Sequence, residues 1–137
     1  MANYFTHFSC LLDVGSPENA ARALDLYAGL SEEAADDDFP PTRFGLAIQP
    51  GEGTHLWIYV DDTGDLEDVI TFVKRCAAEF GLTGRWGFQY SHTCSRPRID
   101  AFGGGAHVLD LATGETVDWI VTDEWLSIVL DGGDPHA

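Results

Sequence analysis

Residues 92–98, HTCSRPR, hold the side chains in this sequence that are best suited to chemistry. A cysteine near arginines loses its proton more easily and becomes a better nucleophile. Neighbouring guanidinium groups bind phosphate and other oxyanions. One hypothesis is therefore a small enzyme or anion-binding domain centred on this segment. The residues that would form the site are His92, Cys94, Arg96 and Arg98.

The spacing within this segment is only partly that of known anion loops. Three residues separate Cys94 from Arg98, a spacing similar to that of the arsenate reductase loop. A histidine two residues before the cysteine is not part of that pattern, and no helix is expected directly after the segment to close an anion cradle. The alternative interpretation is a basic loop that pairs with carboxylates elsewhere in the chain.

Metal-ligating and phosphate-binding motifs are missing from the sequence. It has no CxxC or HxxxH spacing, and the carboxylate runs at 36–38 and 61–62 lack the alternation of an EF-hand. The triple glycine at 103–105 is not followed by the Lys-Ser/Thr pair of a phosphate loop. We expect no metal and no cofactor, and we interpret the glycines as a flexible joint or a close backbone contact.

Negative charge dominates the chain and is unevenly distributed. The sequence has 23 Asp and Glu against seven Lys and Arg, a net charge of −16 at pH 7. Five of the seven basic residues lie between 69 and 98, and residues 99–137 have none. Such a charge repels polyanions and attracts basic surfaces, most strongly at low salt. Acidity that serves only solubility or salt adaptation is the alternative, in which case the protein would be a structural or dimerising accessory module without catalysis.

The leading hypothesis is an acidic binding protein that presents its carboxylates to a basic protein surface. In its sharpest form the protein is a DNA mimic, whose carboxylates occupy the site of a nucleic-acid-binding defence or regulatory protein. The chain itself is not expected to bind nucleic acid or a membrane, and a homodimer is compatible with the sequence. The acids expected to make this surface are Glu32, Glu33, Asp36, Asp37, Asp38, Asp61, Asp62, Asp65, Asp118, Asp123 and Glu124.

Tryptophan offers a second kind of interface signal. The chain has four Trp, more than a core of this size requires, and Trp is enriched among residues that anchor interfaces. Trp57 and Trp86 fall on predicted strands of one sheet and are expected on its open face, opposite the helices. The alternative is that the C-terminal segment covers that face and buries both.

Residues 4–91 alternate between strand and helix patterns. Aromatic and branched residues predict strands at 4–14, 44–49, 54–61 and 85–91. Apolar residues at three- and four-residue spacing predict helices that begin after Ser16 and Asp65. The order strand, helix, strand, strand, helix, strand predicts an α+β protein with a ferredoxin-like antiparallel sheet and both helices on one face.

The remaining residues are expected to extend this sheet. Residues 92–98 predict a polar loop, and 106–111 with 117–121 predict a β-hairpin. Thr122 is expected to cap a short helix at 123–130 that turns Trp125, Ile128 and Val129 inward, with a strand as the alternative. We expect one domain over residues 1–137, with a core at 4–91, an extension at 92–130 and a tail at 131–137.

Cellular context follows from cysteine usage and from a resemblance. Three scattered cysteines, no apolar run long enough to span a membrane, and no signal-peptide pattern indicate a cytoplasmic protein. The segments GLTGRWGFQ, CSRPR and GGGAHVLDLATGETV resemble small acidic accessory proteins of bacterial plasmids and integrative elements. The resemblance implies the context of a mobile genetic element rather than an activity, and it favours the anti-defence form of the leading hypothesis.

Overall fold

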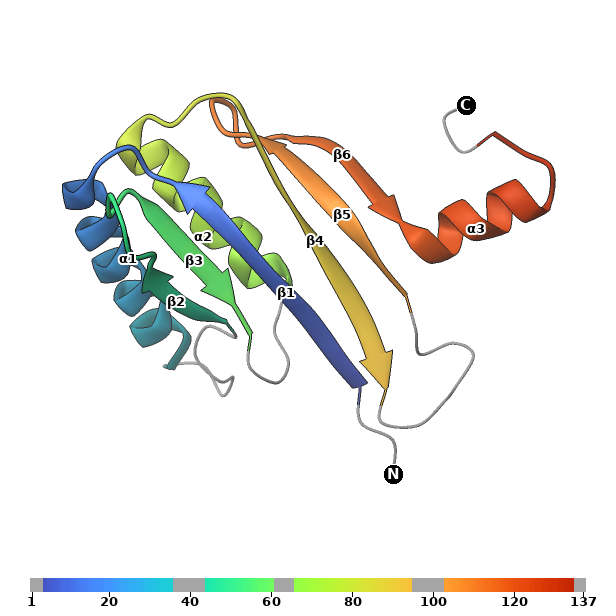
Figure 1. Cartoon of the computed structure of the whole chain (residues 1–137), viewed down its shortest axis with the longest axis horizontal. Helices are drawn as coiled ribbons and strands as arrows, with labels where there is room; N and C mark the ends of the chain where they lie inside the picture. The colour runs from blue at the N-terminus through green and yellow to red at the C-terminus, as the bar shows by residue number, and fades with distance from the viewer. Residues whose placement is uncertain (1–3, 36–43, 61–65, 95–102, 135–137) are drawn as a thin grey trace.

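A six-stranded antiparallel sheet with three helices forms the protein in a computed structural model (Figure 1). The structure describes residues 4–35, 44–60, 66–94 and 103–134. The strands lie in the order β2-β3-β1-β4-β5-β6. They are β1 (Tyr4–Asp13), β2 (Gly45–Ile48), β3 (His55–Tyr59), β4 (Arg85–Cys94), β5 (Gly103–Asp110) and β6 (Thr116–Val121). The helices are α1 (Pro17–Ala35), α2 (Leu66–Phe80) and α3 (Thr122–Leu130).

The core lies between one face of the sheet and the helices α1 and α2. In β4 the side chains of Trp86, Phe88 and Tyr90 are buried while their neighbours point outward, as the alternation of a strand requires. Helix α2 packs a continuous apolar stripe against them. This stripe includes Phe72 and Cys76, both fully buried, in addition to the residues whose spacing predicted it: Leu66, Val69, Ile70, Val73, Ala77 and Phe80.

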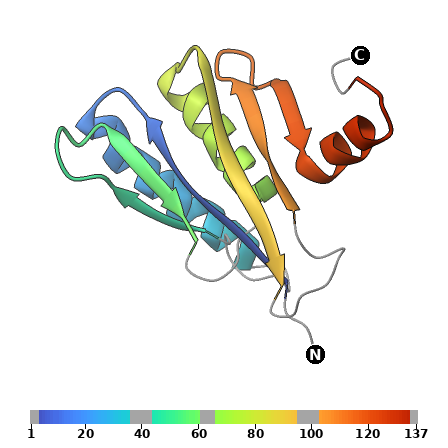
Figure 2. The same ribbon diagram turned by 45° about the vertical axis from the view of Figure 1, so that its right-hand side comes forward.

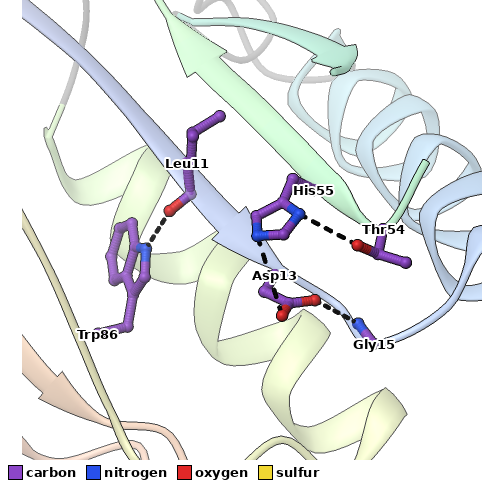
Figure 3. A network of polar contacts seen from close by, with 6 residues as sticks. All are labelled: Leu11, Asp13, Gly15, Thr54, His55 and Trp86. Carbon is purple, nitrogen blue, oxygen red and sulfur yellow. Dashed lines mark hydrogen bonds and ion pairs between the residues drawn. The ribbon is translucent and has the colours of Figure 1, made fainter. Parts of the chain in front are cut away.

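Strand β1 is shared between two neighbours. Its first half, Tyr4–Phe8, pairs with β4, and its second half, Ser9–Asp13, pairs with β3. Where β1 and β4 separate, the indole N–H of Trp86 donates a hydrogen bond of 2.7 Å to the Leu11 carbonyl (Figure 3). The side chain thus satisfies a backbone acceptor that a neighbouring strand would otherwise pair.

The predicted α+β class and the antiparallel sheet are confirmed, and the element order through β4 is the predicted one. The sheet as a whole differs from a four-stranded ferredoxin-like sheet, because β5 and β6 add to it beyond β4. Figures 1 and 2 show α1 and α2 behind the first four strands, whereas no helix within the described ranges lies behind β6.

Two segments predicted as loop or joint belong to strands. Residues 92–94 continue β4, where Thr93 pairs with Phe5 and Cys94 with Tyr4. The triple glycine begins β5 and permits close backbone approaches instead of acting as a joint. A Cβ on Gly105 would lie 2.0 Å from the Ile120 oxygen and 2.7 Å from the Tyr90 hydroxyl, so only glycine fits there.

Helix α3 is confirmed against the strand alternative, but its expected packing is wrong. It has no buried residue, and Trp125, Ile128 and Val129 are all exposed. The expected Thr122 cap is also wrong: the helix begins at Thr122, and that hydroxyl donates a hydrogen bond of 3.0 Å to the Gly104 carbonyl. Beyond this contact with β5 the helix points away from the sheet (Figure 2).

Candidate functional site

Exposed apolar side chains concentrate at the C-terminal end of the described chain. Eight of the twelve large apolar side chains that are exposed in the described ranges come from β6 and α3. We call this set the C-terminal surface. Its members are Val117, Trp119, Ile120, Trp125, Leu126, Ile128, Val129 and Leu130. A group of this kind on a small protein marks an interaction site more often than chance.

Helix α3 is apolar around most of its circumference. Leu126 is 52% exposed and Leu130 is 76% exposed, and both point to a different side of the helix from Trp125 and Ile128. An apolar stripe this wide is normally buried against another element. Nothing within the described residues covers this one, so the apolar surface of α3 is available to a partner.

Strand β6 presents a free sheet edge beside this helix. It pairs with β5 on one side, and its other side has no strand partner in the part of the chain that the structure describes. An exposed edge rich in Val, Ile and Trp is a template for another strand. A groove of about 100 Å³ runs between this edge and α3, with Ile120 on one wall and Trp125 and Ile128 on the other.

Carboxylates frame the groove. Asp118 and Glu124 line it, and Asp123 lies at the start of α3, beside Gly103. No Lys or Arg occurs anywhere in residues 99–137. The electrostatic potential at the groove is therefore negative, which favours a partner that carries positive charge next to apolar side chains.

The other predicted surface acids are not placed together by the structure. The side chains of Glu32 and Glu33, near the end of α1, lie outside the described set, although their backbone is helical. The remaining members also lie outside the described residues: Asp36, Asp37, Asp38, Asp61, Asp62 and Asp65. Asp118, Asp123 and Glu124 are therefore the predicted acids that can be compared with the C-terminal surface, and all three lie on it.

The two predicted interface tryptophans lie on opposite faces of the sheet. Trp57 is 43% exposed on the open face, where it stacks on Tyr59 at 4.2 Å and donates a hydrogen bond of 2.8 Å to Ser9. Trp86 is only 9% exposed and packs in the core with the helices. The expectation that Trp86 lines the open face is wrong, because its position in β4 has the parity of the buried residues.

The predicted anion-site residues are only partly described. His92 and Cys94 lie two residues apart on β4, so their side chains share a face. The Nδ1 atom of His92 is 2.9 Å from the Thr6 hydroxyl, a contact that holds the ring against β1. Arg96 and Arg98 lie outside the described residues. The structure therefore brings His92 next to a hydroxyl and an aromatic ring, that of Tyr90.

The side chains at the C-terminal surface were not identified as a site from the sequence. The signal was nevertheless present, because TDEWLSIVL follows an apolar strand and has acids only in its first turn. A helix this short and this apolar needs a covering layer.

Comparison with known proteins gives no relative from which a function can be carried over. No family model, no curated protein and no solved structure matches the chain. Among the described helices, none is both long and apolar enough to cross a membrane.

Proposed function

We propose that this protein is a binding protein without catalytic activity that docks a basic partner on its C-terminal surface. The observation that carries the proposal is α3, a helix with no buried residue beside a free sheet edge. The framing carboxylates Asp118, Asp123 and Glu124 supply the preference for a positively charged partner. A segment with alternating apolar and basic residues fits best, since it can pair with β6 and fill the groove under α3.

The DNA-mimic form of this proposal is narrower. In it, the partner binds nucleic acid through a basic groove, and carboxylates at the C-terminal surface replace the backbone phosphates. The exposed tryptophans beside these acids then add apolar contacts that DNA does not offer. The proposal includes a cytoplasmic location, which agrees with three cysteines that form no disulfide. The ferredoxin-like arrangement of the first four strands is part of the same proposal and serves as its scaffold.

We do not propose a catalytic role for Cys94. Nucleophilic cysteines normally have a base within hydrogen-bond reach, whereas the His92 ring, two residues away along β4, contacts the Thr6 hydroxyl. Burial raises the pKa of the other two thiols, Cys10 and Cys76, to about 12. Neither of those groups is a thiolate at neutral pH.

Pairing of β6 with β6 of a second copy is the second candidate, and one observation favours it. An antiparallel two-fold places the start of the copy's α3 near the β5–β6 turn. Lys74 lies at that turn, with its Cγ 3.9 Å from the position of a Cβ on Gly114. The acids Asp123 and Glu124 of one copy would then approach Lys74 of the other.

Site-specific photo-crosslinking in the cell that encodes the protein tests the proposal. A photoreactive residue replaces Leu126, 52% exposed on α3, and in a matched control it replaces Leu11, 43% exposed on the open sheet face. We expect an adduct from position 126 with a protein whose contact surface is rich in Lys and Arg, and little adduct from position 11.

Each outcome of this experiment has one meaning. An adduct with twice the mass of the chain supports the second candidate and removes the first. Loss of the adduct when DNA is added supports the DNA-mimic form. Adducts from position 11 alone, or equal yields from both positions, would show that the C-terminal surface is not where the partner docks.

A further inference from the structure

A cavity of about 340 Å³ opens on the helix side of the sheet, beside the start of α2. Its walls come from β1, β4, β5 and β6 on one side and from Leu66, Glu67 and Ile70 of α2 on the other. The cavity is separate from the groove between β6 and α3. Of the residues that line the two, they share only Trp119. The volume is at the lower end of the range found for small-molecule sites.

Flat rings make most of the lining. Phe88 and His107 stack nearly parallel, with an interplanar angle of 12° and ring centroids 6.3 Å apart. The Trp119 ring continues the row at 5.0 Å from His107. The indole N–H of Trp119 donates a hydrogen bond of 2.6 Å to the Tyr90 hydroxyl, which holds this exposed ring against the cavity. Walls of this kind favour a flat ligand, because aromatic rings stack best on one another.

Two buried polar side chains keep hydrogen-bonding capacity on the cavity side. His107 is 4% exposed, and its Nε2 is 2.9 Å from the Thr116 hydroxyl. Its Nδ1 has no hydrogen-bond partner among the described residues. Every side-chain nitrogen or oxygen that is fully enclosed in the described residues does have such a partner, so Nδ1 is not fully enclosed. That Nδ1 must therefore contact solvent, and the cavity that His107 lines is where it does so.

Tyr90 supplies the second group. It is 7% exposed, and its oxygen already accepts the hydrogen bond from Trp119. Its own hydroxyl hydrogen has no acceptor in the described part of the chain and is available as a donor. Gly105 lies next to this hydroxyl, and because it has no side chain, the Tyr90 ring fits at this position.

The site disfavours charged ligands. Burial, and then the positive charge of Lys74, lower the pKa of His107, so its ring is neutral at pH 7. The carboxylate in the lining, that of Glu67, belongs to an exposed residue, so no buried charge is present to balance an ionised ligand inside the cavity. The net charge of −16 further disfavours an anion.

We propose that this cavity binds an uncharged, planar heteroaromatic molecule of one or two fused rings. The ligand stacks against Phe88, His107 and Trp119, accepts a hydrogen bond from Tyr90, and bonds His107 Nδ1. The cavity shares Trp119 with the C-terminal surface, but none of its other lining residues belongs to that surface, so ligand binding can be tested apart from partner docking.

Titration followed by NMR tests the proposal on the whole chain. The probes are adenine and indazole, which are planar and uncharged, with benzoate as a planar anion and cyclohexanol as an uncharged ring that is not planar. We expect the indole N–H resonance of Trp119 to shift and to saturate with adenine or indazole. The Trp125 and Trp57 resonances, from rings of 44% and 43% exposure, should not move.

Variants separate cavity binding from stacking on the surface. Ile70→Trp fills the cavity and should weaken binding more than about tenfold, and Tyr90→Phe should weaken it about three- to tenfold by removing one hydrogen bond. Ile48→Trp on the exposed part of β2 is the matched control and should bind as the parent does. If Ile70→Trp does not fold, Leu66→Trp tests the same wall.

The proposal is overturned by either of two results. One is the absence of a saturable Trp119 shift with adenine and indazole up to about 5 mM, the weak limit for fragments of this size. The other is a shift that is the same in the filled variant or is equally large at Trp125. Failure of the docking proposal would leave both readouts unchanged, so the two proposals fail separately.

Discussion

Apolar side chains are buried at one end of this sheet and exposed at the other. Under β2, β3, β1 and β4, the helices α1 and α2 leave Leu12, Leu56 and Phe72 at 1% exposure or less. Beyond β4, the strand β6 and helix α3 leave Trp119, Leu126 and Leu130 more than half exposed. The same chain therefore buries its apolar side chains at one end of the sheet and exposes them at the other. Figure 1 shows α1 and α2 at the first end and α3 at the second.

This difference indicates what each end is for. Burying apolar surface is the main favourable term in folding. The first end shows that this chain can cover its apolar side chains with helices. Leaving eight large apolar side chains exposed at the other end costs solubility, which the high negative charge offsets. We infer that the first end supplies the stable core of the protein and that the second end supplies the surface that binds a partner.

The largest contrast is expected from truncating one aromatic side chain at each end. Phe72→Ala empties a fully buried site and should lower the free energy of unfolding by about 3–5 kcal/mol. Trp125→Ala removes a ring that is 44% exposed and lies outside the core, and it should change the free energy of unfolding by less than about 1 kcal/mol. Urea unfolding followed by circular dichroism measures both. A loss of more than about 2 kcal/mol from Trp125→Ala would mean that α3 belongs to the core.

The attachment of the C-terminal end to the sheet is tested by Gly105→Ala. The added Cβ meets the Ile120 oxygen across the β5–β6 pair, so this substitution should destabilise the protein by about 1–3 kcal/mol. Gly29→Ala is the matched control, because a Cβ there contacts nothing within 4 Å and alanine suits the interior of α1. We expect the control to be neutral or slightly stabilising in the same urea experiment.

Acid should weaken the protein through His107. Because the folded-state pKa of His107 is lowered, the unfolded chain binds the proton more tightly than the folded chain does. Its contribution is therefore fully present above the ordinary histidine pKa of 6.5 and is lost as pH falls below it. His107→Gln keeps a nitrogen for Thr116 but cannot titrate, so its stability should depend less steeply on pH between 7 and 5. Equal slopes in thermal unfolding would contradict this assignment.

Substitutions of exposed leucines on α3 are expected to have the smallest effect on stability and the largest effect on partner binding. Leu130→Ser and Leu126→Ser change exposed positions on α3 and should alter the free energy of unfolding by less than about 0.5 kcal/mol. The same pair should reduce crosslinking to the partner severalfold, whereas Leu11→Ser on the open face should not. If Leu11→Ser weakens partner binding as much, the division between the two ends is wrong.

Much of the first end was predictable from the sequence because its patterns are local. The alternation in β1 and β4 and the apolar stripe of α2 identify the buried faces without knowledge of the fold. The prediction ended β4 too early because residues 92–94 are polar. Their side chains are satisfied across the sheet, where His92 contacts Thr6 and Thr93 contacts His7, and no local pattern reveals such pairs.

The second end was not predictable in the same way. An apolar stripe on a helix indicates that this face must be buried, but it does not indicate whether the same chain or a partner buries it. The sequence therefore predicted Trp125 and Ile128 as inward-facing residues. The cavity depends on rings from β4, β5 and β6 that meet only when the strands pair in register, so no spacing in the sequence marks it.

Hydroxyl-radical footprinting of two tryptophans tests the central claim most directly. Trp125 on α3 and Trp57 on the open sheet face are 44% and 43% exposed, so radicals should oxidise them to similar extents in the purified protein. Inside the cell that encodes the protein, we predict that oxidation of Trp125 falls severalfold relative to Trp57, because the partner covers the C-terminal surface. An unchanged ratio of Trp125 to Trp57 oxidation, in the cell and in isolation, would contradict the account.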